Sequence, residues 1–188
     1  MNVPDSNRDD ARGEPARPCG PLVPGRAEIE TARLRLAPLV PADAEALWHL
    51  TDDPGIVAAI SFLRHPFTLA AAAALIARNR SDRDLFRGIR RRQDDALVGV
   101  VGVHARAGGA IEIGYWIGTQ FRRQGYALEA GHGVVASLRS ASPAAPIIAE
   151  CRPGNRASWR LLERLGFRPT GAPGTRPGRR ELALTASV

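Results

Sequence analysis

Hydrophobic and polar residues alternate with a period of two in several short stretches of the chain. Leu34 and Leu36 alternate with Arg33 and Arg35, as expected of a strand with one buried face. Further strand signals lie at residues 85–90, 96–103, 111–117, 147–151 and 181–184. Turn residues at 94–95 and 108–109 separate three of these strands, which predicts a three-stranded antiparallel meander over residues 85–117.

Helical periodicity fills the intervals between the strands. Apolar residues recur at helical spacing in segments 41–50, 69–80, 125–139 and 156–165. Thr68 and Asn155 are suited to cap the second and fourth helices, and Gly166 is suited to end the fourth. Residues 52–55 are expected to stop the first helix, and residues 167–178 to form a loop.

The chain divides into a short tail and one folded domain. Residues 1–27 are rich in proline, glycine and arginine and have few large apolar side chains. Such a segment cannot bury enough apolar surface to offset the entropy lost on ordering, so we predict a mobile tail. Residues 28–188 contain the strands and helices without an internal repeat, and we predict a single mixed α/β domain there.

Charge is the strongest feature of the composition. The chain has 188 residues and a formal net charge of +7, with a pI near 11.0. All 26 basic residues are arginine, which excludes a P-loop lysine, a lysine Schiff base and a lysine general base. The positive charge suits nucleic acid, an anionic membrane surface, or phosphorylated and acidic small molecules.

Other sequence signals bear on location and on metals. No apolar run approaches the length of a transmembrane helix, and the N-terminus lacks a signal-peptide core, so we expect a cytoplasmic protein with no membrane partner. Cys19 and Cys151 lie far apart, and no two of the four histidines are spaced i, i+4. We therefore expect no disulfide framework and no metal.

Residues 111–130 have the pattern of a phosphate-binding site. A strand leads through a basic turn into a helix that begins at about Gly125. The first N–H groups of a helix have no partner within it, and the helix dipole is positive at that end. Gly125 lets the backbone approach a phosphate closely, Ala127 keeps the first turn small, and Arg122 and Arg123 add full positive charge.

Three segments of the sequence together resemble a known family. Arg122-Arg-Gln-Gly-Tyr-Ala127 resembles the pyrophosphate motif (Gln/Arg)-x-x-Gly-x-(Gly/Ala) of the GNAT N-acetyltransferases. Glu112-Ile-Gly-Tyr-Trp-Ile117 precedes it at the spacing of the branch that acetylates ribosomal-protein N-termini, and Asn155-x-x-Ser158 with Leu161-Leu-Glu-Arg-Leu-Gly-Phe167 is similar to that branch's second signature. The resemblance covers about residues 28–185.

The resemblance implies a fold and a cofactor. The implied fold has a mixed, mostly antiparallel sheet of six to seven strands with about four helices, and it splays open between two parallel central strands. The implied co-substrate is acetyl-CoA, whose pantetheine arm enters the splay. The residues implied to bind it are Tyr115, Trp116, Ile117, Arg122, Arg123, Gln124, Gly125, Tyr126, Ala127 and Asn155. Trp116 also fits a core position, because alternate residues of a strand face opposite sides.

Acetyl transfer requires a neutral amine, which bears on the choice of base. At pH 7, deprotonation costs about 4–5 kcal/mol for a lysine side chain and about 1 kcal/mol for an α-amino group. Glu112 is the candidate base, acting directly or through water, with a solvated carboxylate or an arginine partner as the alternative. Ser158 is the candidate for directing a proton to the leaving thiolate, although a local capping bond would also explain it. Asn155 can cap the helix, bind the cofactor, or do both.

The function expected from these features is transfer of an acetyl group to a protein N-terminus or a small-molecule amine by direct attack. The alternatives are an acyl-CoA-binding module without catalysis and a basic nucleic-acid-binding protein. Only 5% of the residues are aromatic, and apart from Arg90–Arg92 the arginines are dispersed, which argues against nucleic acid. We expect a monomer or a homodimer, with the acceptor selected by residues 49–66 and 170–180.

Overall fold

The computed structural model describes residues 27–80 and 83–185. The predicted mobile tail lies outside them apart from Ala27, and so does Cys19. The tail and its boundary with the domain therefore stay predictions.

The described residues form one eight-stranded sheet, with strand order β1-β2-β3-β4-β5-β6-β8-β7. All neighbouring strands are antiparallel except β5 and β6, which are parallel. The strands are β1 Ile29–Glu30, β2 Leu34–Pro38, β3 Asp84–Arg91, β4 Leu97–Ala105, β5 Ile111–Ile117, β6 Ile147–Cys151, β7 Phe167–Pro173 and β8 Arg180–Leu184. The predicted meander is confirmed as β3–β5, and the sheet has more strands than the six to seven expected.

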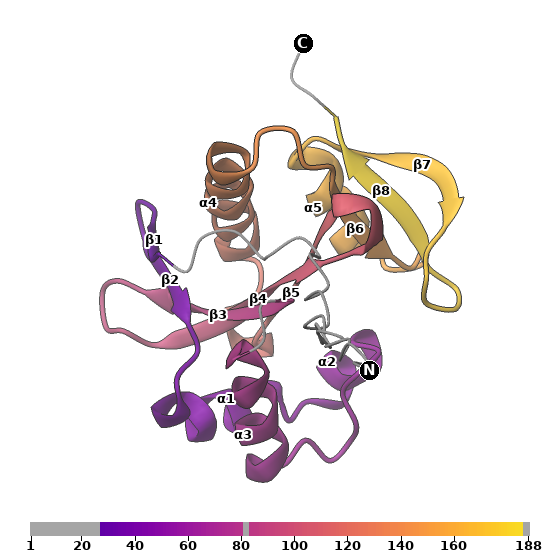
Figure 1. Cartoon of the computed structure of the whole chain (residues 1–188). Helices are drawn as coiled ribbons and strands as arrows, with labels where there is room; N and C mark the ends of the chain where they lie inside the picture. Colours follow the sequence, from indigo (N-terminus) through magenta and orange to yellow (C-terminus); the bar gives the residue numbers. More distant parts are fainter. Residues whose placement is uncertain (1–26, 81–82, 186–188) are drawn as a thin grey trace, which may run out of the picture.

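Helices cover both faces of the sheet (Figure 1). They are α1 Ala44–Thr51, α2 Pro54–Ala59, α3 Leu69–Ala77, α4 Tyr126–Ala141 and α5 Arg156–Arg164. Helices α4 and α5 pack on one face, and α1 and α3 pack on the other. Alternate residues of β5 divide between the two layers, so that Ile113 lies in the core with α4 and Trp116 in the core with α1.

Two elements differ from the sequence expectation. Residues 52–55 do stop α1, but Asp53 then caps a further helix, α2, by accepting from the amides of Gly55 at 2.8 Å and Ile56 at 3.0 Å. Pro54 at the first helical position is typical of a helix start. The pair Asp53-Pro54 therefore already indicated α2 in the sequence.

The loop expected after Phe167 is instead strand β7, paired with β8. Phe167 is fully buried and fixes the start of this strand in the core. The strand lies at the edge of the sheet, where Pro169 and Pro173 are tolerated because a missing N–H interrupts no second ladder. The glycines and prolines of this segment therefore indicate an irregular edge strand rather than a loop.

The central parallel strands separate after a short contact. β5 pairs with β6 only at Ile111–Ile147 and Glu112–Ile148. Beyond Glu112, β5 continues to Ile117 beside β4, whereas β6 continues to Cys151 beside β8. The sheet therefore opens at about Gly114, and no described strand pairs with that edge of β5 beyond Glu112.

Candidate active site

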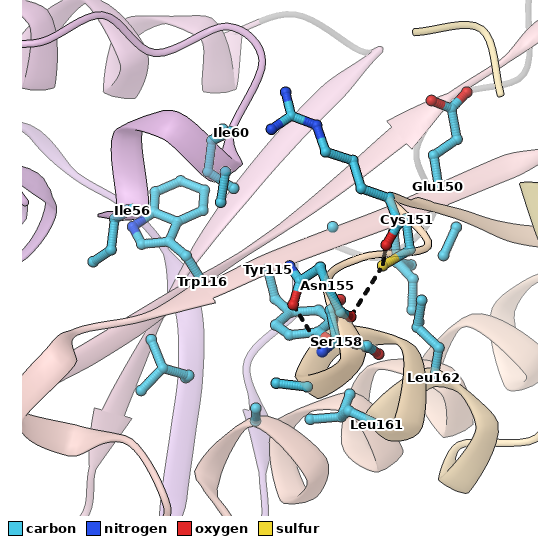
Figure 2. Close-up of a pocket in the computed structure, with 18 of the residues that line it drawn as sticks. Ile56, Ile60, Tyr115, Trp116, Glu150, Cys151, Asn155, Ser158, Leu161 and Leu162 are labelled. Carbon is cyan, nitrogen blue, oxygen red and sulfur yellow. Dashed lines mark hydrogen bonds between the residues drawn. The ribbon is translucent and has the colours of Figure 1, made fainter. Parts of the chain in front are cut away.

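A cleft of about 1260 Å³ occupies the opening between β5 and β6. Its walls come from both layers: α2, β4 and β5 on one side, and β6, α5 and the start of α4 on the other (Figure 2). Every predicted site residue except Gln124 lines this cleft. The Gln124 side chain instead donates to the backbone oxygen of Gln120 at 3.4 Å.

The start of α4 forms one end of the cleft. Gly125 caps the helix with a φ of 81°, a left-handed conformation that favours glycine. Its carbonyl accepts from the amides of Leu128 and Glu129, each at 3.1 Å. The amides of Tyr126 and Ala127 precede these and have no acceptor within the helix. Together with the exposed Arg122 and Arg123 side chains, this end offers N–H donors and positive charge to a phosphate group.

Glu129 fixes this end of the cleft and was missed by sequence reasoning. Its carboxylate accepts from the Thr31 hydroxyl at 2.6 Å and from the backbone amide and Nε of Arg33, each at 2.7 Å. Burial opposes ionisation of Glu129, but these hydrogen bonds prevail and its pKa lies below the ordinary value. The first turn of α4 is thereby tied to the segment that leads into β2. An acidic residue in a first helical turn was the only signal in the sequence.

Tyr115 and Ser158 meet in the middle of the cleft (Figure 2). The two hydroxyl oxygens share a hydrogen bond of 2.8 Å across 43 residues of sequence. Asn155 Oδ1 accepts from the Ser158 amide at 3.2 Å, so Asn155 does cap α5. Burial raises the pKa of Tyr115 to about 12, although the bond from Ser158 opposes the shift, and the phenol is therefore protonated at neutral pH.

Trp116 belongs to the core as well as to the cleft wall. It is 6% exposed and packs among the residues of α1 and α3. Its indole N–H donates to Thr51 Oγ1 at 3.0 Å, which fixes the ring against the end of α1. The core position expected of Trp116 is confirmed, and its contact with a cofactor stays a prediction.

Glu112 lies at the other end of the cleft in a network of buried carboxylates and partly exposed arginines. Its Oε2 accepts from Arg106 Nε at 2.6 Å, and its Oε1 accepts from Arg176 Nη2 at 2.7 Å. Arg176 also donates to Glu150 Oε2 at 3.0 Å, and Glu150 Oε1 accepts from the Thr175 hydroxyl at 2.6 Å. Glu112 is thus an arginine partner on both oxygens, which leaves one lone pair on each oxygen for a water or another donor.

The lowered pKa values of Glu150 and Glu129 predict how the stability of the fold depends on pH. Burial alone would raise the pKa of Glu150, but hydrogen bonds from Thr175 and the charge of Arg176 outweigh it and lower the pKa; Glu129 behaves likewise. A lowered folded-state pKa contributes stability that is present above the unfolded-state value and is lost as pH falls through the folded-state value. We expect the free energy of unfolding, measured in urea, to fall from about pH 5 downward.

A variant isolates the contribution of Glu150. Glu150→Gln should be less stable at pH 7 and should show a shallower loss of stability below about pH 5. Glu45→Gln, whose side chain is 79% exposed, serves as the control and should follow the wild type. Identical acid profiles for wild type and Glu150→Gln would contradict this prediction.

The described residues, 27–80 and 83–185, contain neither a candidate membrane span nor a candidate metal site. Within these ranges no helix is long and apolar enough to cross a membrane. The same ranges hold no group of three or more histidine, cysteine or acidic residues placed to bind a metal ion.

Comparisons with known proteins agree with this architecture. A family model described as "Acetyltransferase (GNAT) domain" matches residues 33–168. The uncharacterized N-acetyltransferase YoaA of Bacillus subtilis is 32% identical over 149 residues, which cover 76% of this chain and 84% of that protein.

Solved structures resemble the fold over most of their length. A GNAT-family acetyltransferase from Bacillus anthracis has a TM-score of 0.72 at 24% identity, covering 84% of this chain and 96% of that one. Mycobacterium smegmatis RimJ, in complex with CoA-disulfide, has a TM-score of 0.72 at 22% identity, covering 86% and 88%. At these identities the structures show the fold alone. The match to the family model, with the related sequence, shows that the chain belongs to the GNAT acetyltransferase family and is an acyltransferase.

Proposed function

We propose that this protein transfers an acetyl group from acetyl-CoA to a primary amine by direct attack of the amine on the thioester. The observation that carries the proposal is the opening between β5 and β6, which begins beyond Glu112 and lies beside the N-terminus of α4. The unpaired edge of β5 can bond the amides of the pantetheine arm as an added strand would. The related RimJ fold, whose structure contains a coenzyme A species, supports the choice of cofactor.

Different residues of the cleft are proposed to bind different parts of the cofactor. The N–H groups at the start of α4, with Arg122 and Arg123, are proposed to bind the phosphates. Tyr115, Trp116 and Ile117 would guide the arm toward the opening. The backbone amides of β5 would then stabilise the negative charge that develops on the thioester oxygen.

Ser158 is proposed to return a proton to the leaving thiolate. It is backed by the Tyr115 hydroxyl, which stays protonated at neutral pH and can replace the proton that Ser158 gives up. Burial raises the pKa of Cys151, although Ser158 opposes the shift, so its thiol is a poor nucleophile at neutral pH. Direct transfer therefore fits this site better than an acyl-cysteine intermediate.

Glu112 is proposed to assist the acceptor amine in a role that its two arginine partners permit. Because two arginines hold the buried carboxylate in place, we propose that it acts as a fixed negative charge, or through a water bound to a remaining lone pair, rather than by direct proton abstraction. Replacing it with glutamine removes that charge and tests the assignment.

The function itself is tested by binding and by mass shift. Acetyl-CoA should raise the melting temperature in a saturable way. A panel of peptides with N-terminal alanine, serine or methionine, together with primary alkylamines, should reveal an acceptor that gains one acetyl group. No thermal shift with acetyl-CoA, alongside tight and salt-sensitive binding to DNA, would instead favour the nucleic-acid alternative.

The proposed donation of a proton by Ser158, backed by Tyr115, gives a separate prediction. Ser158→Ala and Tyr115→Phe should each lower kcat by about 10-fold, a modest loss because a thiolate of pKa about 8.5 is already a fair leaving group. The KM for acetyl-CoA should stay nearly constant, and the exposed Ser140→Ala on α4 serves as the control. Unchanged kcat in both cleft variants would remove this role from Ser158.

A further inference from the structure

His104 has no part in the function proposed above, yet it lies in the same cleft. It is on β4, directly opposite Glu112 in the pairing of β4 with β5, so both side chains lie on the α1 face of the sheet. The His104 side chain is only 8% exposed. A ring so well buried beside Glu112 in the cleft requires an explanation.

Asp84 on β3 holds one nitrogen of the ring. Asp84 Oδ1 lies 2.6 Å from His104 Nδ1, and Asp84 Oδ2 accepts from Arg78 Nη2 at 2.7 Å. The hydrogen bond from His104, followed by that from Arg78, keeps the pKa of Asp84 below its ordinary value. An ionised carboxylate can only accept, so Nδ1 donates and, in the neutral ring, Nε2 is the nitrogen with a free lone pair.

The direction of the ring follows from Gly102. A Cβ atom placed on Gly102 would lie 2.6 Å from His104 Nε2, so the imidazole leans along β4 over this glycine. Gly102 pairs with Gly114 of β5, the position at which the opening to β6 begins. Nothing lies within 4 Å of a Cβ placed on Gly114. The imidazole thus fills the space over Gly102, while the space over the paired Gly114 stays open to the cleft, so Nε2 lies over the strand position next to this open space.

We propose that His104, oriented by Asp84, is the group that takes the proton from the acceptor amine. This inference rests on the proposed acetyl transfer. The amine nitrogen forms a bond to the thioester carbonyl carbon, and its proton passes to His104 Nε2. The tetrahedral intermediate then collapses and breaks the carbon–sulfur bond, and the coenzyme A thiolate receives a proton from Ser158.

The surroundings of the ring suit this role. The acidic groups facing it are Asp84 from β3 and Glu112 from β5. Both stabilise the imidazolium once it forms, while their arginine partners Arg78, Arg106 and Arg176 hold the carboxylates in place. The Phe86 ring packs against the imidazole in a T-shaped arrangement, with centroids 5.3 Å apart. In this arrangement His104 accepts the proton, and Glu112 contributes charge to the imidazolium.

Kinetics of matched variants test the assignment with the best acceptor from the panel above. At pH 7, His104→Gln should lower kcat/KM by about 100-fold, the lower end of the range for general bases. Its rate should keep rising with pH, because the amine then deprotonates by itself, whereas the wild type should level off. Glu112→Gln should keep the levelling-off, and the exposed His132→Gln should match the wild type throughout. If Glu112→Gln abolishes the levelling-off and His104→Gln retains it, the assignment is overturned.

A spectroscopic measurement on the wild type needs neither a variant nor an acceptor. Nitrogen-15 NMR of labelled histidine should place the single proton of neutral His104 on Nδ1, and Asp84→Asn should shift that tautomer balance. A proton on Nε2 in the wild type would overturn the inference even if acetyl transfer is observed. Failure of acetyl-CoA to bind the wild type would instead overturn the proposed function.

Discussion

Replacing Ala127 with glutamate should weaken acetyl-CoA binding by about 100-fold with little effect on the stability of the fold. Ala127 is the second residue of α4, where a carboxylate is favourable to the helix by about 0.3–1 kcal/mol because it lies near the positive end of the dipole. The same carboxylate would repel a bound phosphate by about 3 kcal/mol per unit charge at about 5 Å and an effective dielectric constant of 20. This corresponds to an affinity loss of about 100-fold.

The added charge favours the helix but repels a bound phosphate, and this difference makes the variant informative. Urea unfolding should show stability close to that of the wild type, because the favourable charge at the helix start offsets the cost of replacing a partly buried alanine, and calorimetric titration should show the loss of acetyl-CoA affinity. Ala136→Glu, an exposed position farther along the same helix, adds the same charge away from the cleft and should bind normally. Normal affinity in Ala127→Glu would place the phosphates elsewhere.

Replacing Gly99 with alanine should cause a large loss of stability. A Cβ at this position would lie 2.6 Å from the backbone oxygen of Trp116 and 2.5 Å from Ile117 Cδ1. The backbone atom cannot move without disturbing the pairing of β4 with β5, so we expect a loss of about 1–3 kcal/mol or more. Chemical unfolding with matched slopes measures it.

Gly114 provides the matched control on the adjacent strand. It has no atom within 4 Å of a built Cβ, so Gly114→Ala should leave stability nearly unchanged or raise it by about 0.4–1 kcal/mol through the unfolded state. Because Gly114 lines the cleft, this variant would narrow the space proposed for the acyl group while the fold stays intact. Equal losses in the two variants would show that the close contact at Gly99 is not the cause.

Local patterns were sufficient to predict much of this fold. The apolar segments 96–103 and 111–117, which are separated by turn residues, predicted β4 and β5 because each strand is marked by its own residues. The basic turn before α4 could also be predicted from local sequence, since its glycine, its arginines and the helix start are adjacent along the chain. The sheet opening came from the family resemblance, because strand separation after Glu112 leaves no local pattern.

The parts that escaped prediction depend on contacts between distant residues. Tyr115 and Ser158 are 43 residues apart, and Arg176 reaches Glu112 across 64 residues. No periodicity marks such pairs, because they exist only once the strands and loops are assembled. His104 illustrates the same limit: its sequence neighbours indicate only a strand, whereas its partner Asp84 lies on another strand, 20 residues earlier.

Hydrogen exchange with and without acetyl-CoA tests the central claim most directly, since it locates the cofactor on the chain. If the opening between β5 and β6 holds the arm and the start of α4 holds the phosphates, acetyl-CoA should slow amide exchange in residues 111–117 and 122–128 together. Ala127→Glu should lose both effects at the same cofactor concentration. Protection confined to another surface, or unchanged exchange in these two segments while acetyl-CoA is bound, would contradict the account.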